Sequence, residues 1–77
     1  MEINEFIDNL AAQFDDTPAD QIKPETVFRD LAEWSSLIAL SVIAMADEEY
    51  GVTLKGDDIK GATTVQDLFN AVVAKKG

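Results

Sequence analysis

Apolar residues return every three or four positions near both ends of this chain, and that spacing is the strongest limit on its fold. Residues at such intervals share one face of an α-helix. No segment alternates apolar and polar residues in the manner of an exposed strand. We therefore predict an all-α fold with amphipathic helices over residues 3–14 and 65–76. Their apolar faces should hold Ile3, Phe6, Ile7, Leu10, Ala11 and Phe14 in the first, and Val65, Leu68, Phe69, Val72 and Val73 in the last.

Capping signals mark a longer helix in the middle of the chain. Ser35 is a favourable N-cap for the apolar run that follows it. Gly51 can take the left-handed conformation that commonly ends a helix. We therefore expect a helix from the pair of Ser35 and Ser36 to Tyr50. Pro18 ends the first helix, because the residue before a proline is displaced from the α region.

Two weaker features complete the expected architecture. Thr64 and Asp67 have the spacing of a capping box before the last helix, and one short turn of helix is expected within residues 56–61. The segment 18–35 is long for a loop, and its apolar residues predict that it packs on the core; they are Ile22, Val27, Phe28, Leu31 and Trp34. The prediction is a small four-helix bundle with three longer helices, one short helix and a long ordered loop, forming one domain over residues 1–77.

The chain contains no cysteine and no histidine. This excludes disulfides and thiolate metal ligands, and it removes the usual general base and the commonest metal ligand. We therefore expect neither a metal site nor catalysis by the chain itself. The run Gly56-Asp57-Asp58 lacks the spaced ligands and closing glutamate of a calcium loop, and we interpret it as a helix cap.

Acidic residues outnumber basic ones, and they are concentrated toward the beginning of the chain. The net charge is −9; residues 1–50 hold twelve acids against two basic residues, whereas residues 51–77 hold three acids against four lysines. Such a field repels nucleic acid and anionic membrane surfaces and attracts partners with basic patches. From charge alone, a role in solubility is an equally good explanation.

The expected location is the cytoplasm. No apolar run approaches the length of a membrane span. The first nine residues also carry acids where a secretory signal carries basic residues.

The middle helix has more apolar surface than a core needs. One stripe, which we expect to face the core, contains Ala39, Ile43, Ala46 and Tyr50, flanked by Leu40 and Val42. The opposite stripe contains Leu37, Ser41, Ala44 and Glu48, with Ile38 and Met45 beside it. This second stripe is either an exposed docking surface or a further part of the core of a central helix, and the pattern alone favours neither.

The pair of Ser35 and Ser36 is the one local feature that could carry chemistry. Two serines before an apolar run are usually helix caps. A catalytic serine needs a base, which this chain lacks, whereas a serine modified by another enzyme needs none. A phosphodiester at this point would also lie at a helix N-terminus, where free N–H groups favour an anion.

Four segments together resemble the acyl carrier protein family. They are Phe28-Arg29-Asp30-Leu31, Ser36-Leu37, Asp47-Glu48-Glu49-Tyr50-Gly51-Val52 and Thr63-Thr64-Val65-Gln66-Asp67-Leu68, in the family's order and spacing. The resemblance covers nearly the whole chain. It implies a non-catalytic carrier whose cofactor, 4′-phosphopantetheine, is transferred from coenzyme A and attached covalently to a serine.

The resemblance places the attachment at Ser36, with Ser35 as the alternative. Ser35 stands where most relatives have an aspartate, and the stretch before Ser36 is one residue longer than usual, with Trp34 in the extra space. The front of the middle helix is also more apolar than in relatives that serve fatty acid synthesis. This departure favours a specialised lipid or polyketide pathway.

The resemblance also implies partners: a phosphopantetheinyl transferase, and acyl-loading and condensing enzymes with basic docking patches. The expected docking residues are Leu37, Ile38, Ser41, Met45, Asp47 and Glu48. We expect a monomer that carries acyl or polyketide intermediates as thioesters, with the possibility that the acyl chain tucks into the bundle beside Ala39, Ala44 and Ala46. The alternatives are a peptidyl or aminoacyl carrier for a peptide synthetase and an unmodified helical adaptor.

The charge distribution makes a first prediction. Twelve acids within fifty residues repel one another in the folded chain. Added salt screens this repulsion, because the Debye length falls from about 10 Å at 0.1 M to about 3 Å at 1 M ionic strength. The melting temperature at neutral pH should therefore rise with added sodium chloride or divalent cations. A melting temperature indifferent to ionic strength would contradict this interpretation.

Overall fold

The computed structural model describes residues 2–76, and the two end positions of the expected domain, Met1 and Gly77, lie outside the described residues. Within residues 2–76 there are four α-helices and no extended strand beyond an isolated bridge between Val27 and Thr64. The helices are α1 (Ile3–Ala11), α2 (Ser36–Tyr50), α3 (Gly56–Gly61) and α4 (Val65–Lys76). The predicted all-α bundle of three longer helices and one short one is confirmed.

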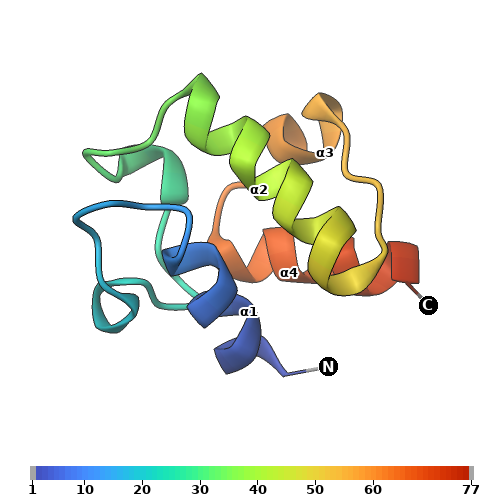
Figure 1. Cartoon of the computed structure of the whole chain (residues 1–77), viewed down its shortest axis with the longest axis horizontal. Helices are drawn as coiled ribbons and strands as arrows, with labels where there is room; N and C mark the ends of the chain where they lie inside the picture. The colour runs from blue at the N-terminus through green and yellow to red at the C-terminus, as the bar shows by residue number, and fades with distance from the viewer. Residues whose placement is uncertain (1, 77) are drawn as a thin grey trace.

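The helices surround one core (Figure 1). α2 runs across the front of α4, and α1 contacts both of them, while α3 packs on α4 behind α2. The long segment between α1 and α2 covers one side of the bundle and contains two 3₁₀ turns, η1 (Ala19–Gln21) and η2 (Phe28–Asp30). The segment is therefore ordered, as its apolar residues predicted.

The largest fully buried side chains come from three helices and from the long loop. Each contributes roughly 1.5–3 kcal/mol through loss of contact with water. They are Phe6 and Leu10 of α1, Phe28 of the loop, Val42 of α2, and Val65, Leu68 and Val72 of α4. Because Phe28 is among them, the loop is part of the core.

α1 ends earlier than its apolar pattern predicted. The pattern continues to Phe14, but the helix ends at Ala11. The N–H of Gln13 bonds to the carbonyl of Leu10, and that of Phe14 bonds to the carbonyl of Ala11. These bonds span three residues, and such bonds often tighten the last turn of a helix. Phe14 is nevertheless buried in the core. The apolar pattern therefore identified it correctly as a core residue, but the prediction that it is helical was wrong.

The predicted ends of α2 are confirmed. The Ile38 N–H donates to Ser35 Oγ at 3.3 Å, which makes Ser35 the N-cap. Gly51 is left-handed, with φ of 65°, and its N–H donates to the Asp47 carbonyl at 3.0 Å, as in the αL cap motif.

The caps of the shorter helices are also present. The N–H groups of Thr63 and Thr64 both donate to Asp67 Oδ2 at 3.0 Å, and the Asp67 N–H donates to Thr64 Oγ1. The Lys55 N–H donates to Asp58 Oδ2 at the start of α3. These bonds lower the pKa of each carboxyl group, and for Asp58 the ammonium group of Lys75 contributes as well.

The long loop bonds to two other helices. The Thr26 carbonyl accepts the N–H of Val65 at 2.9 Å, and the Pro24 carbonyl accepts that of Gln66 at 2.8 Å, so the loop satisfies the first turn of α4. The Arg29 guanidinium donates to three carbonyls at the end of α3, those of Ile59, Lys60 and Ala62. A cation is favourable at a helix C-terminus.

Glu33 ties the end of the same loop to the turn after α1. Its carboxylate accepts the Thr17 hydroxyl at 2.6 Å, the Asp16 N–H at 2.8 Å and the Asp15 N–H at 3.0 Å. The hydroxyl of Thr17, followed by the N–H groups of Asp16 and Asp15, favours the ionised carboxylate and lowers the pKa of Glu33 below its usual 4.5.

These bonds predict a pH-dependent contribution from Glu33. A carboxyl group whose pKa is lower in the folded state stabilises the fold above its unfolded pKa, and the contribution disappears as the pH falls through the lowered value. The substitution Glu33→Gln should therefore lower the melting temperature by several degrees at pH 7 and by little at pH 3. Melting curves from pH 7 to pH 3 measure the difference.

The matched control is Glu25→Gln. Glu25 is exposed, and its side chain forms no hydrogen bond or ion pair with any residue from 2 to 76. The melting curve of this variant should follow that of the parent. An equal loss of stability in both variants would refute the role assigned to Glu33.

Candidate functional site

The serine pair lies at the start of α2, and its two hydroxyl groups are used differently. Ser35 is outside the helix and holds the N-cap bond to Ile38. Ser36 is the first helical residue, is exposed, and its side chain forms no hydrogen bond with residues 2–76. Of the two hydroxyl groups, that of Ser36 is therefore the one available for chemistry by an external enzyme.

A groove of about 650 Å³ adjoins both serines, between α2 and α3. Its lining comes from the loop, from one side of α2 and from α3. The residues are Arg29, Trp34, Ser35, Ser36, Ala39, Leu40, Ile43, Gly56, Ile59 and Lys60. The groove is lined mainly by apolar side chains and lies beside the accessible Ser36 hydroxyl. The two apolar stripes of the predicted middle helix did not indicate it, because it is formed by two helices and the loop together.

The groove has no acidic residue in its lining, although the chain as a whole is strongly acidic. Arg29 and Lys60 line it, and no aspartate or glutamate does. The Arg29 guanidinium is hydrogen-bonded to the carbonyls at the end of α3. Lys60 is exposed. This environment fits an anionic phosphodiester on Ser36, followed by an apolar group, because neither meets a carboxylate.

Aromatic contacts fix the residue just before the serines. The Trp34 ring meets the Phe28 ring edge-on, with 4.8 Å between the ring centroids, and lies 6.5 Å from the Phe14 ring. Edge-to-face pairs at such distances are stabilising. Phe14 and Phe28 are buried, and Trp34 is half-buried. Trp34 therefore has one part against the core and another beside the groove.

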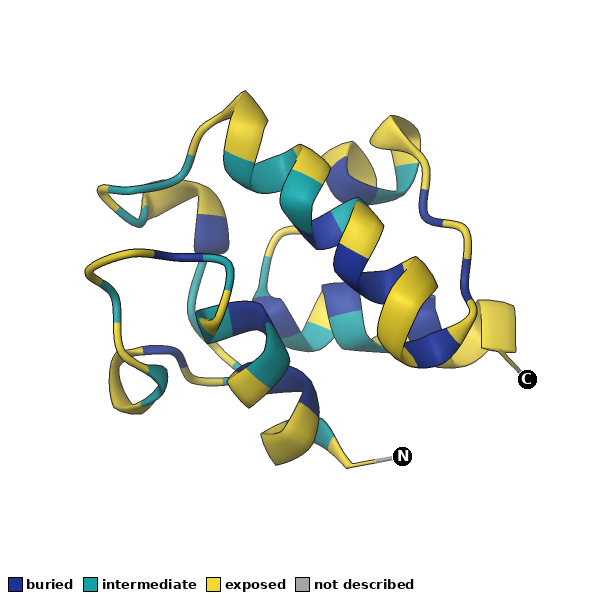
Figure 2. Cartoon of the chain, in the orientation of Figure 1, coloured by how far each residue is buried: buried dark blue, intermediate teal, exposed yellow. Residues whose placement is uncertain are grey.

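The exposed side of α2 differs from the prediction. Leu37 and Leu40 are 76% and 63% exposed, and Ala44, Asp47 and Glu48 are exposed beyond them along the helix. We call these five residues the α2 ridge; the row of exposed residues along α2 is visible in Figure 2. Its first half is apolar and its second half is acidic.

Three predicted docking residues are not on this ridge. Met45 is only 4% exposed and belongs to the core, so its expected exposure was wrong. Ile38 is half-buried and packs on the core, and Ser41 is partly buried. Leu40, by contrast, was expected beside the core and is exposed.

The cause is a rotation of α2 about its axis relative to the expected orientation. Val42, Met45, Ala46 and Tyr50 are the buried residues of α2. Ala39 and Ile43, expected in the core, are half-buried and line the groove instead. Because α2 is apolar on nearly every side, its sequence did not fix which side faces the core.

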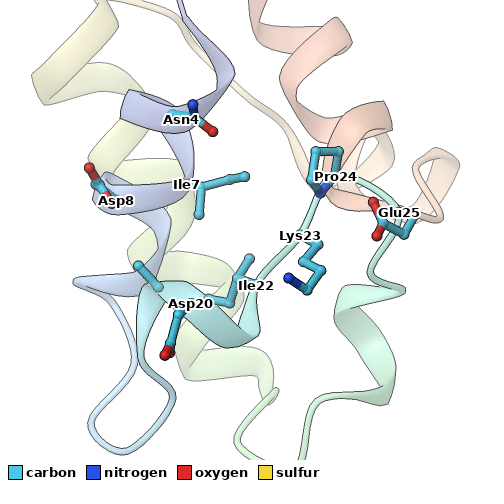
Figure 3. A pocket seen from close by; sticks show the side chains of 9 residues that line it. Asn4, Ile7, Asp8, Asp20, Ile22, Lys23, Pro24 and Glu25 are labelled. Carbon is cyan, nitrogen blue, oxygen red and sulfur yellow. The ribbon is translucent and has the colours of Figure 1, made fainter.

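A second hollow, of about 490 Å³, lies between α1 and the first part of the long loop (Figure 3). Ile7 and Ile22 form its apolar part, and Asp8, Asp20 and Lys23 are among its charged residues. No residue predicted to bind a cofactor or a partner lines it. It is therefore not part of the candidate site.

Two further searches of residues 2–76 gave negative results. No three acidic side chains of this part of the chain are grouped so as to hold a metal ion. None of its helices combines the length and apolar character needed to cross a membrane.

The chain is similar to a known family and to known proteins over most of its length. A sequence profile for the family described as "Phosphopantetheine attachment site" matches residues 5–72. The acyl carrier protein of Thermobifida fusca (strain YX) is 32% identical over 71 residues, covering 88% of this chain and 90% of that protein. The acyl carrier protein of Acidothermus cellulolyticus is 34% identical over 55 residues, covering 71% and 66%. No solved structure matches the chain significantly.

Proposed function

Because this chain belongs to the acyl carrier protein family, whose members bear covalently attached 4′-phosphopantetheine, we propose that Ser36 is its attachment site. The observation that carries the proposal is the free Ser36 hydroxyl beside an acid-free groove. Ser35 is the weaker candidate, since its hydroxyl oxygen caps α2. Attachment at Ser35 would have to use the oxygen that caps α2, whereas attachment at Ser36 leaves that bond in place.

The chain's own part in attachment is to present a nucleophile. In the proposed step, the Ser36 oxygen forms a bond to the β-phosphorus of coenzyme A, the pyrophosphate bond breaks, and adenosine 3′,5′-bisphosphate leaves. The transferase supplies the magnesium ion. It also supplies the base that takes the hydroxyl proton, because this chain has no histidine to act as one. Once attached, the arm supplies the thiol that holds an acyl group as a thioester, which explains how a carrier works without a cysteine.

Partners are proposed to dock on the α2 ridge. Leu37 and Leu40 would form the apolar centre of each contact, and Asp47 and Glu48 would pair with basic residues at its edge. Acidic charge speeds the approach of a basic partner, and a small contact allows rapid release. A carrier must be passed among a transferase, acyl-loading enzymes and condensing enzymes, so brief contacts suit it.

The full proposal is a non-catalytic, monomeric carrier of acyl or polyketide intermediates in the cytoplasm. The apolar first half of the α2 ridge favours a specialised lipid or polyketide pathway over general fatty acid synthesis. A peptidyl or aminoacyl carrier is the second candidate, because such carriers use the same attachment chemistry. An unmodified adaptor would use the ridge without the serine.

Intact mass tests the attachment site. Incubation with coenzyme A and a broad-specificity phosphopantetheinyl transferase should add one phosphopantetheine group to the parent and to Ser35→Ala. The Ser36→Ala variant should keep its original mass. Labelling of Ser36→Ala as fast as the parent would overturn the assignment, and an unlabelled parent would favour the adaptor.

Transferase kinetics test the α2 ridge. The substitution Leu40→Asp places a charge where a partner would bury an apolar side chain, a contact worth about 1.5 kcal/mol, so KM for the carrier should rise about tenfold. The control is Val73→Asp on α4, because Val73 is 41% exposed and lies outside both the ridge and the groove. Equal KM values for the two variants would exclude the ridge as the docking surface.

A further inference from the structure

The short link that leads into α2 has few backbone anchors of its own. We define this link as residues 32–35, between Leu31 and the first residue of the helix. Within residues 2–76, the only N–H group of the link that donates to a backbone carbonyl is that of Trp34, and its acceptor is the nearby Leu31 at 3.0 Å. Each residue has two soft backbone dihedrals, so such a segment needs side-chain contacts to hold one position.

Two neighbouring side chains of the link supply these contacts. The ring of Trp34 packs against Phe28 and Phe14. The carboxylate of Glu33 bonds to the turn after α1. Ring contacts are apolar and tolerate small shifts, whereas hydrogen bonds weaken steeply when their angles change. Glu33 is therefore the anchor that fixes the direction of the link.

Both carboxylate oxygens of Glu33 take part in this contact. Oε1 accepts the Thr17 hydroxyl at 2.6 Å and the Asp16 N–H at 2.8 Å, while Oε2 accepts the Asp15 N–H at 3.0 Å. We call these four residues the Glu33 clamp. Hydrogen bonds to an ionised acceptor are roughly twice as strong as those between neutral groups. The clamp thus joins the link firmly to the turn after α1, which lies beside it in Figure 1.

The clamp acts close to the serine pair and far from the rest of α2. Glu33 precedes the N-cap, Ser35, by two residues and Ser36 by three. Further along, α2 is held by its own buried side chains, the first of which is Val42. Release of the clamp would therefore free the link and the first turn of the helix, while the exposed Leu40 and the acidic half of the α2 ridge would keep their places.

We propose that Glu33 is a positioning residue, which holds the Ser36 hydroxyl in place for attack on coenzyme A by clamping the link to the turn after α1. This inference rests on the proposed function, since it needs attachment at Ser36. It goes beyond it by assigning a task in that step to a side chain three residues away. Misplacement of a reacting group slows the chemical step, whereas docking on the α2 ridge does not involve the link. The expected signature is a lower kcat at nearly constant KM.

Transferase kinetics test this signature. Glu33→Ala removes all three bonds of the clamp, so kcat for modification should fall about three- to tenfold. KM for the carrier should stay near that of the parent, the opposite of the pattern expected for Leu40→Asp. An unchanged kcat in Glu33→Ala would overturn the proposal, and so would a raised KM without a fall in kcat.

Thr17 tests whether the clamp works as one unit. Thr17→Val keeps the shape of the side chain and removes its hydroxyl, so kcat should fall, but by less than in Glu33→Ala. Thr17→Ser keeps the hydroxyl and should restore the kcat of the parent. In the Glu33→Ala background, Thr17→Val should have no further effect, because the bond that it removes is already absent. Effects of the two substitutions that simply multiply would refute the clamp.

Two controls separate positioning from a general loss of stability. Tyr50→Phe removes the 2.9 Å hydrogen bond from Asn9 at the far end of α2, so it should lower the melting temperature without lowering kcat. Glu25→Ala removes an exposed carboxylate that has no bonded partner in the part of the chain that the structure describes, and it should change neither quantity. An equal fall of kcat in Tyr50→Phe and Glu33→Ala would overturn the proposal.

Amide exchange measures the serine pair directly, before any arm is attached. The N–H groups of Ile38 and Ala39 both bond to Ser35 and so report on the first turn of α2. In Glu33→Ala they should exchange about three- to tenfold faster than in the parent. In Tyr50→Phe they should exchange as in the parent. Unchanged exchange of both amides in Glu33→Ala would contradict the proposal.

Intact mass separates this inference from the proposed function. If the parent gains no phosphopantetheine group, the attachment proposal fails. If the parent is modified and Glu33→Ala is modified with the same kcat, only the inference about Glu33 fails.

Discussion

The hydrogen bonds that the loop between α1 and α2 makes with other elements are the constraint on which the site depends. Backbone groups at helix ends need partners from outside the helix. Thr26 and Pro24 provide them for the start of α4, and Arg29 provides them for the end of α3. Glu33 binds the turn after α1. A segment held by this many hydrogen bonds has a defined path. That path places Trp34, Ser35 and Ser36 beside the groove.

A carrier of this kind needs a negative surface to attract basic partners and an acid-free environment for its phosphodiester. The charges of this chain are distributed so that both needs are met. The acids of residues 1–50 give the chain a negative field that suits basic partners. The same field would oppose a phosphodiester if acids surrounded Ser36. They do not, because the groove beside it has Arg29 and Lys60 and no carboxylate. The exposed acids Asp47 and Glu48, which we propose to face partners, lie beyond the apolar half of the α2 ridge, about three turns of helix from Ser36.

The sequence predicted what depends on local patterns. Capping residues identified both ends of α2 and the start of α4, and the spacing of apolar residues identified the existence of α1 but not its end. It did not predict which side of α2 faces the core, because Leu40 and Met45 are both apolar and only packing decides that Met45 is buried. Nor did it predict the groove. The groove depends on the path of the loop, and the bonds of Arg29 to carbonyls some thirty residues away have no local signature.

Ser35, which stands where the sequence resemblance leads us to expect an aspartate, is compatible with the same geometry. Serine and aspartate are about equally good N-caps, so the bond to the Ile38 N–H, and with it the start of α2, survives the change. What is lost is a negative charge one residue before the hydroxyl proposed to receive a phosphate. That loss extends the acid-free surface of the groove to the attachment point. It also means that a partner cannot recognise this end of α2 through a carboxylate at that position, which is consistent with our proposal that partners bind the exposed apolar side chains of Leu37 and Leu40.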